Sequence, residues 1–126
     1  MNKMKYGEKA IVKNELEAVP NPALKRRYTI ELECPEFTCK CPRSGFPDFA
    51  TIFISYVPDK YIVELKSLKL YINSFRDKYL FHEAVANIIL DDLVKLIKPF
   101  AMSIKADFTR RGNIHTVIKA EYRKKK

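Results

Sequence analysis

Two hydrophobic periods meet in residues 49–75, FATIFISYVPDKYIVELKSLKLYINSF. The first part, FATIFISYVP (49–58), is rich in β-branched and aromatic residues, and a Pro-Asp turn leads into a second strand-like segment, KYIVELK (60–66). Beyond this segment the apolar residues recur at helical spacing. They are Leu68, Tyr71, Ile72 and Phe75. The stretch therefore predicts strand, strand and helix in direct succession.

The flanking segments continue this order of elements. YTIELEC (28–34) alternates like a strand, and a longer helix is predicted over about residues 82–98, where Pro99 ends it. Two alternating segments follow, FAMSIKADF (100–108) and IHTVIKAEY (114–122), joined by the hairpin-turn sequence TRRGN. This order is typical of an α+β fold with an antiparallel sheet and two helices on one face.

The long helix has one apolar face, which must pack against a sheet or another helix. Its members are Val85, Ile88, Ile89, Leu93, Leu96 and Ile97. With the helices on one face of the sheet, the other face and the edges need partners. We therefore expect the protein to self-assemble.

Length and composition fit one compact domain. The chain has 126 residues, of which 47% are hydrophobic and 31% charged, as in an ordinary globular protein. We expect a mostly irregular arm over 1–27, one domain over 28–123 and a basic tail over 124–126. No apolar run reaches the roughly 18 residues that span a bilayer, and the first residues lack a secretory signal, so we expect a cytoplasmic protein without membrane contact.

The charge balance favours anionic partners. Lysine and arginine total 24 against 15 acidic residues, a net charge of +9, which attracts phosphates of nucleic acid or of a small cofactor. The segment EYRKKK (121–126) contains four of the positive charges and fits a solvated tail equally well.

Three cysteines, Cys34, Cys39 and Cys41, lie close together. Their odd number argues against a disulfide framework, and a Cys39–Cys41 bridge would close a small, strained loop. With His82 and His115 they are the candidate zinc ligands, but Cys-x-Cys is shorter than the spacing of zinc-binding cysteine pairs, and no second pair follows. We therefore expect free thiols and no metal.

The segment CPRSGFPD (41–48) allows a nucleophilic interpretation. Its Pro and Gly residues let the chain fold back and bring Asp48 near Cys41, with neither residue inside a strand. A thiolate is a strong nucleophile, and a neighbouring carboxyl group can give and take its proton. An ionised Asp48 would raise the cysteine pKa, which Arg43 would offset. From these residues alone, a buried structural cysteine is the stronger alternative.

Two helix starts offer further binding groups. Lys66 and Lys69 lie near an expected helix start at Ser67, where free backbone N–H groups favour phosphates; two solvated lysines are the alternative. Glu83, at the start of the long helix, is either a cap or an acceptor for the amide and amine edge of a guanine-like base.

Three segments resemble, in order and spacing, the NADPH-dependent 7-cyano-7-deazaguanine reductases, the QueF family. They are CPRSGFPDFATIFISYVPDK (41–60), VELKSLKLYINSFRD (63–77) and FHE (81–83). The resemblance covers about residues 34–115. The family's lysine signature is met by Glu64, Leu65, Lys66, Ser67, Leu68, Lys69, Leu70 and Tyr71.

The resemblance implies an enzyme that reduces a nitrile to a primary amine with two NADPH, in the synthesis of the queuosine base of transfer RNA. It implies that Cys41 attacks the nitrile carbon to form a covalent thioimide, that Asp48 donates a proton and that His82 assists. A protonated thioimide accepts hydride more readily than a free nitrile. The implied substrate-binding residues are Val63, Glu64, Leu65, His82 and Glu83, and the implied NADPH-binding residues are Lys66, Ser67 and Lys69.

The resemblance also implies the tunnelling fold, which is similar to that of GTP cyclohydrolase I. In that fold the sheets of several subunits join into a barrel and the sites form between subunits. Members with a single module, like residues 28–123 here, assemble as two stacked pentamers. The implied partners are the nitrile substrate and further copies of the chain, with no direct nucleic-acid contact.

The sequence departs from the family pattern at two places. The turn RRGNIH (110–115) differs from that of many members, which leaves a cofactor contact at Arg111 or Gly112 open. Position 85 is Val, where some relatives have a cysteine able to pair with the nucleophile. Protection of the nucleophile by that disulfide is therefore absent here.

Three other functions compete with nitrile reduction. An amidine-forming relative, which adds ammonia to the nitrile on transfer RNA without NADPH, should lack the lysine signature that Lys66, Ser67 and Lys69 retain here. A zinc cyclohydrolase is disfavoured because this sequence lacks the set of zinc ligands that such an enzyme needs. A basic RNA-binding module would use the C-terminal cations with exposed aromatic side chains.

Overall fold

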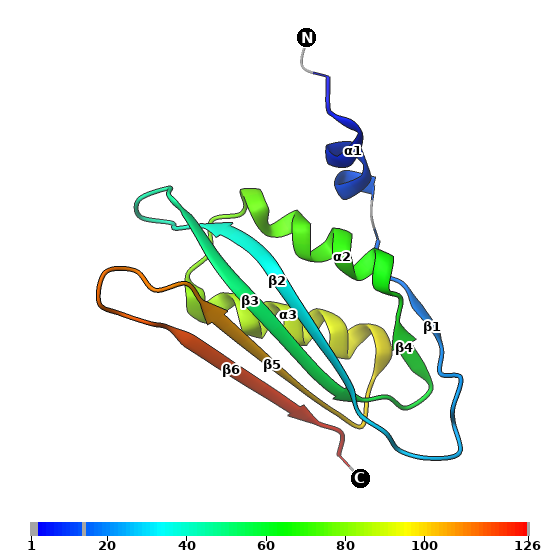
Figure 1. Cartoon of the computed structure of the whole chain (residues 1–126). Helices are drawn as coiled ribbons and strands as arrows, with labels where there is room; N and C mark the ends of the chain where they lie inside the picture. The colour runs from blue at the N-terminus through cyan, green and yellow to red at the C-terminus, as the bar shows by residue number, and fades with distance from the viewer. Residues whose placement is uncertain (1–2, 14, 126) are drawn as a thin grey trace.

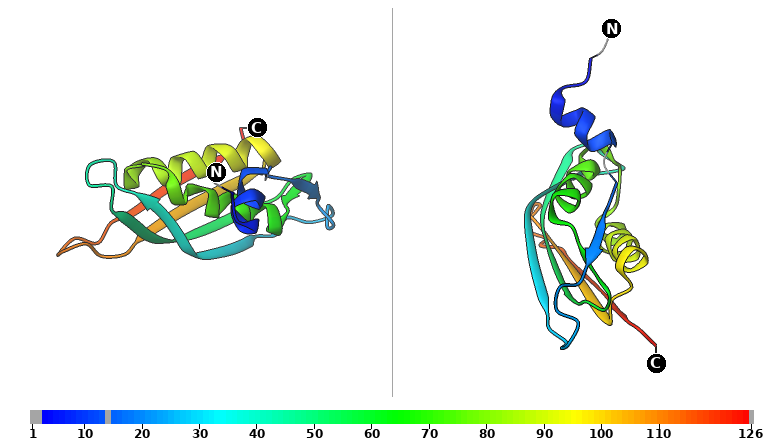
Figure 2. Two further views of the ribbon diagram at one scale, coloured as in Figure 1. Left: turned by 90° about the horizontal axis from the view of Figure 1, so that it is seen from above. Right: turned by 90° about the vertical axis from the view of Figure 1, so that its right-hand side faces the viewer.

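The computed structural model describes residues 3–13 and 15–125. Its elements are, in order, α1 (Tyr6–Lys13), β1 (Ala18–Pro20), β2 (Ile30–Lys40), β3 (Pro47–Val57), β4 (Tyr61–Val63), α2 (Leu65–Asn73), the 3₁₀ helix η1 (Ser74–Asp77), α3 (His82–Ile97), β5 (Ala101–Phe108) and β6 (Val117–Arg123). A four-stranded antiparallel sheet has the order β2-β3-β5-β6, and β1 pairs with β4 in a second sheet. Helices α2 and α3 lie on one face of the larger sheet (Figure 1, Figure 2). The predicted α+β class is confirmed.

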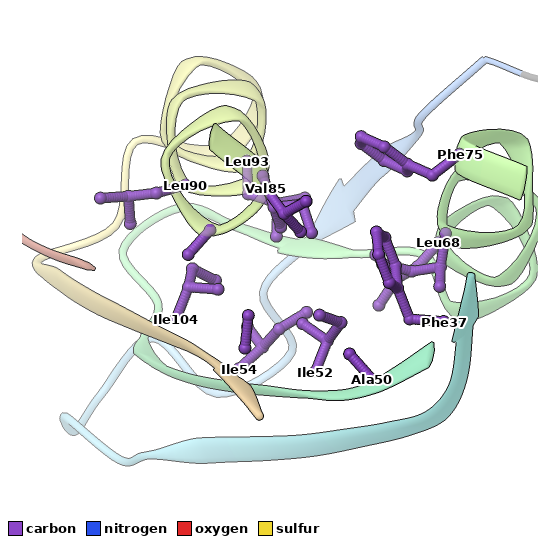
Figure 3. Close-up of a cluster of buried hydrophobic side chains, with 14 of the residues drawn as sticks. Phe37, Ala50, Ile52, Ile54, Leu68, Phe75, Val85, Leu90, Leu93 and Ile104 are labelled. Atoms are coloured by element: carbon purple, nitrogen blue, oxygen red, sulfur yellow. The ribbon is translucent and has the colours of Figure 1, made fainter. Parts of the chain in front are cut away.

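The core lies between this sheet and the two helices (Figure 3). Every second residue of β3 and β5 is buried, as the period of a half-covered strand requires. The buried strand residues are Ala50, Ile52, Ile54, Tyr56, Met102, Ile104, Ala106 and Phe108, and they face Leu68 and Ile72 of α2 and Val85, Ala86, Ile89, Leu90, Leu93 and Ile97 of α3. The predicted apolar face of α3 is largely confirmed, although Ile88 and Leu96 are only partly buried.

Strand β2 changes its phase at a bulge. Its register against β3 shifts between Cys34 and Phe37, so that Phe37 and Cys39 both turn toward the core and are fully buried. Phe37 contacts the rings of Phe75 and Phe108 with centroid distances of 5.4 and 6.3 Å. The bulge therefore sets which side chains of β2 face inward just before the hairpin that follows.

The N-terminal segment contains two short elements within the arm predicted over 1–27. They are the helix α1 and the strand β1, which pairs with β4. The Glu17 backbone N–H donates to Ser67 Oγ at 3.0 Å, and the Glu64 N–H donates to the Glu17 carbonyl at 2.9 Å. Residues 18–20 therefore belong to the folded body. The sequence pattern did not indicate this strand, because backbone pairing with a distant strand gives no periodic signal in so short a segment.

The region after β3 departs from the prediction. Of the expected strand 60–66, Tyr61–Val63 forms the strand β4, and it pairs with β1. Helix α2 begins at Leu65, with Glu64 as its N-cap, slightly before the expected start at Ser67. None of the helices in the described ranges is both long enough and apolar enough to cross a membrane.

Candidate active site

The hairpin between β2 and β3 positions Cys41. The Cys41 N–H donates to the Phe46 carbonyl at 2.9 Å, and the Gly45 N–H donates to the Cys41 carbonyl at 2.8 Å. Gly45 has a φ of 76°, a left-handed conformation that glycine adopts without steric cost. Cys41 therefore lies directly after β2, on a turn closed by backbone hydrogen bonds.

Asp48 lies inside strand β3, paired in register with Cys39. The prediction that Asp48 stays outside a strand is wrong, because β2 and β3 both extend beyond the expected limits toward a short turn. Its carboxylate is only 7% exposed. Asp48 Oδ2 lies 3.2 Å from His82 Nε2, and Asp48 Oδ1 lies 3.3 Å from Arg111 Nη2. A buried carboxylate needs such partners, and here each oxygen has its own.

Two features hold His82 against Asp48. The segment before α3 runs beside the end of β2, where the Lys40 N–H donates to the Lys78 carbonyl at 2.9 Å and the Leu80 N–H donates to the Lys40 carbonyl at 3.0 Å. The imidazole belongs to the first residue of α3. It stacks on the Phe108 ring, with 3.8 Å between the ring centroids and 9° between the ring planes. His82 is therefore fixed both through its backbone and through its ring.

Arg111 is the part of this cluster that sequence reasoning did not place. It lies in the turn between β5 and β6, where its N–H donates to the Ile114 carbonyl at 3.0 Å. Gly112 follows with a φ of 59°, which allows the tight reversal. The sequence around an arginine in a basic turn does not indicate that the arginine will pair with a buried carboxylate elsewhere in the chain.

The surroundings of Cys41 favour its thiolate. The Ser44 hydroxyl donates a hydrogen bond to the sulfur, and the backbone N–H groups of Ser44 and Arg43 donate as well. These bonds lower the pKa of Cys41 below its ordinary value, against smaller opposing effects of desolvation and of the Asp48 charge. Arg43 thus acts through its backbone, whereas the sequence suggested its side-chain charge. Cys39 differs, because burial, followed by the charges of Asp48 and Cys41, raises its pKa to about 11.

Removal of the Ser44 hydroxyl should make Cys41 less reactive. In Ser44→Ala the thiolate loses its first hydrogen-bond donor, so the Cys41 pKa rises and a smaller fraction is ionised at neutral pH. We expect a several-fold lower rate of alkylation by iodoacetamide near pH 7, and a pH–rate profile displaced toward higher pH. Intact-mass spectrometry measures the rate. Ser103→Ala, on the sheet far from the hairpin, should leave the profile in place; an unmoved profile in Ser44→Ala would contradict this account.

Known proteins match nearly the whole chain. The QueF family, described as QueF-like protein, matches residues 47–126. The chain is 59% identical to the NADPH-dependent 7-cyano-7-deazaguanine reductase of Trichormus variabilis, over 96% of this chain and 89% of that protein. It is 57% identical to the protein of the same name from Thermosynechococcus vestitus, over 97% and 92% of the two chains. The chain belongs to this reductase family.

A solved structure shares the fold at much lower sequence identity. The archaeosine synthase QueF-Like, in its apo form, matches with a TM-score of 0.66 and 17% identity, over 75% of this chain and 91% of that chain. At this identity the match concerns the fold alone. The family resemblance drawn from the motifs is confirmed by the relatives above.

The N-terminus of α2 is capped by the side chain of Glu64. The Glu64 carboxylate accepts hydrogen bonds from the N–H groups of Ser67 at 2.7 Å and Lys66 at 3.0 Å, which keeps the pKa of Glu64 below its usual value. The prediction that free N–H groups at this helix start would bind a phosphate is therefore wrong for the N–H groups of Lys66 and Ser67. Lys66 and Lys69 are exposed and can offer only their side-chain ammonium groups.

Ser67 points inward. It is 3% exposed, and its hydroxyl donates to the Glu64 carbonyl at 2.8 Å and accepts from the Glu17 N–H. Its side chain therefore holds the helix start and the N-terminal segment together instead of facing a ligand at the surface.

Within one chain the predicted site residues form two groups. Cys41, Asp48, His82 and the neighbouring exposed Glu83 lie near the β2–β3 turn, whereas α2 starts beside β4 at the other end of the molecule (Figure 1, Figure 2). The second group contains buried Val63, the cap Glu64, Leu65, which is 61% exposed, and the two lysines. A single copy therefore does not bring the predicted cofactor lysines to the thiol.

Several apolar side chains near the thiol are exposed. They are Phe46, Phe49, Tyr79, Phe81 and Ile114. Such a group in one region typically marks a surface that contacts a ligand or another chain. Within the described ranges, no group of three or more His, Cys, Asp or Glu side chains is arranged to hold a metal ion.

Proposed function

We propose that this protein reduces the nitrile of 7-cyano-7-deazaguanine to the primary amine of 7-aminomethyl-7-deazaguanine, in the synthesis of the queuosine base of transfer RNA. The observation that supports this most strongly is a thiol with a lowered pKa, Cys41, one turn from the buried Asp48 and its partner His82. The chain around it is 54–59% identical to proteins named as reductases of this nitrile.

Cys41 is the proposed nucleophile. Its sulfur bonds to the nitrile carbon, the carbon–nitrogen triple bond becomes a double bond, and the nitrogen takes a proton, which gives a thioimide. The lowered pKa of Cys41 supports this role, because the thiolate is the attacking species. Cys39 is buried, and its raised pKa keeps it a protonated thiol, so it does not compete.

The Asp48–His82 pair is the proposed source of that proton. The two side chains are within 3.2 Å, so a proton can pass from the pair to the nitrile nitrogen while the remaining charge stays on a fixed partner. Arg111, at 3.3 Å from the other oxygen of Asp48, stabilises the carboxylate that is left. Glu83, exposed beside His82, is proposed to accept hydrogen bonds from the deazaguanine edge, a bidentate geometry that suits a carboxylate.

The cofactor would be held mainly by cations. When bound, NADPH supplies hydride to the carbon attached to the sulfur. Lys66 and Lys69 are exposed on the first turns of α2 and fit its phosphates as point charges. Ser67 is proposed to position these lysines through its hydrogen bonds to Glu64 and Glu17. Val63 and Leu65 flank the same helix start, the proposed substrate-contacting segment; Leu65 is exposed there, whereas the Val63 side chain is buried and would support the segment from the core.

We propose that the two groups of site residues meet between copies of the chain. A barrel of the tunnelling fold, as in a decamer of two stacked pentamers, would join strands at the free edges of β2 and β6. The exposed apolar residues near Cys41, together with exposed Leu65 near the lysines, support such contacts. The neighbouring copy would then bring Lys66 and Lys69 to the thiol.

One assay tests the function. Purified protein is mixed with 7-cyano-7-deazaguanine and NADPH, and the amine and the oxidised cofactor are quantified. Reduction of a nitrile to an amine needs two hydrides and two protons, so two NADPH should be consumed for each amine formed. Nitrile consumed with NADPH unchanged would instead indicate the amidine-forming alternative.

A double variant separates the two proposed parts of the site. Lys66→Ala/Lys69→Ala should still form the Cys41 adduct but should need a much higher NADPH concentration for turnover, by about tenfold or more. Lys95→Ala, an exposed lysine on α3, is the matched control and should behave like the unchanged protein. An unaltered NADPH requirement in the double variant would contradict the assignment of the lysines.

A further inference from the structure

A second basic site lies at the far end of the sheet. Three chain segments, 27–29, 100–101 and 123–125, together with Val57, line a hollow of about 460 Å³. Asp48 is at the start of β3 and Val57 at its end, so the hollow is roughly 30 Å from the thiol along that strand. It includes neither the nucleophile nor the cofactor lysines.

The hollow is built around one aromatic ring. The Arg27 guanidinium lies 3.9 Å from the Phe100 ring centroid, and Lys124 Nζ lies 5.2 Å from it. The Phe100 N–H donates to the Val57 carbonyl, and the Lys124 N–H donates to the Phe100 carbonyl, each at 2.9 Å. The ring thus orients two cations from distant segments, and backbone hydrogen bonds fix the ring.

The segment that presents Arg27 is also ordered by a buried polar residue. Asn21 is 6% exposed; its Nδ2 donates to the Asp59 carbonyl at 2.7 Å, and its Oδ1 accepts from the Tyr28 hydroxyl at 2.5 Å. Arg27 therefore precedes Tyr28, which is joined through Asn21 to the β3–β4 turn, and is not on a free arm.

The charge in the hollow is not balanced by the groups that surround it. Arg27, Arg123, Lys124 and Lys125 line it, and Asp59 Oδ2 lies 2.7 Å from Lys124 Nζ. Glu121, two residues before Arg123 on β6, lines the adjoining hollow. Four cations against these two carboxylates leave an excess of positive charge in one concave surface. Fixed cations in a hollow focus the potential and attract multivalent anions.

We propose that this hollow binds a phosphate-bearing polyanion. Guanidinium groups suit phosphate oxygens because they donate paired hydrogen bonds. The Phe100 ring is covered by cations, so recognition is directed at phosphates rather than at a stacked base. Phosphates of this kind occur in free nucleotides and in an RNA strand, and the experiment distinguishes these two sources.

Calorimetric titration of the whole protein with tripolyphosphate tests the site. Arg27→Ala/Arg123→Ala should weaken binding by about tenfold or more, because two phosphate contacts are lost. Arg26→Ala/Lys95→Ala removes the same charge from exposed positions outside the hollow and should change binding by less than about twofold. Lys125→Glu, at an exposed position near the chain end, should also weaken binding without disturbing packed atoms. Thermal melts of each variant check the fold.

Competition identifies the source of the phosphate. Displacement of tripolyphosphate by a short RNA hairpin supports a nucleic-acid strand, and displacement by ATP but not by the hairpin supports a free nucleotide. Equal loss of binding in both double variants would attribute binding to the general positive field and overturn the proposal. Absence of saturable tripolyphosphate binding, or binding lost only in Lys66→Ala/Lys69→Ala, would overturn it as well.

Discussion

Cys41→Ala is expected to abolish the covalent adduct and to lower turnover by about 10⁴-fold or more, as removal of a nucleophile does in other covalent enzymes. The physical reason is that no other thiol of the described chain combines access with a lowered pKa. Cys39 is fully buried with a pKa raised to about 11, and burial raises the pKa of Cys34 as well. Incubation with 7-cyano-7-deazaguanine in the absence of NADPH, followed by intact-mass measurement, detects the adduct.

Cys34→Ala is the matched control for this prediction. Cys34 is a half-buried thiol on β2, distant from the hairpin turn, and its removal should leave adduct and turnover unchanged. Amine formation at an undiminished rate in Cys41→Ala would show that the thioimide is not on the reaction path. Loss of the adduct in Cys34→Ala as well would indicate a general effect on folding.

Asp48→Asn should lower turnover by about 10²- to 10⁴-fold, the range of a lost proton-transfer group. The amide has nearly the same volume, so packing is kept, but it removes the negative charge that pairs with His82 at 3.2 Å and Arg111 at 3.3 Å. Steady-state rates across pH measure the effect. We expect a changed pH–rate profile along with the lower rate, which distinguishes proton transfer from a structural role.

A second carboxylate–imidazole pair provides the control. Asp107 Oδ1 lies 2.6 Å from His115 Nε2, but both side chains are more than a third exposed, and the pair is solvated. Asp107→Asn should therefore leave the rate and its pH dependence intact. A reduction of comparable size in Asp107→Asn, or a normal pH–rate profile in Asp48→Asn, would remove the proton-transfer role from Asp48.

Strong periodic patterns made the fold predictable. The alternation in β3 and β5 and the helical spacing in α3 reflect burial on one face, so the element types and the antiparallel α+β class could be inferred without tertiary information. Short elements held by backbone pairing were missed, as with β1, because a few residues without a period leave no pattern. The same limit applies to element ends, where hydrogen bonding extends β3 back to Pro47 and places Asp48 in a strand.

The candidate site, like the fold, was predictable only in part from the sequence. The motif around Cys41 and the Lys66–Lys69 signature identified the family, because such residue types at such spacing are specific. The arginine beside Asp48, the inward direction of Ser67 and the capping role of Glu64 were not evident, since each depends on contacts between segments distant in sequence or on local cap geometry.

By itself the sequence determined the class of fold and the family, and through the family resemblance it pointed to Cys41 as the proposed nucleophile, because these follow from local periods and from short, specific motifs. Only the tertiary structure decided that Asp48 is buried between His82 and Arg111, that the lysines proposed to bind the cofactor lie at the other end of the same chain, and that Arg27 joins the C-terminal cations around Phe100. The physical reason is that charge pairing and burial depend on distances through space, and chain folding sets those distances between residues whose spacing along the chain carries no trace of them.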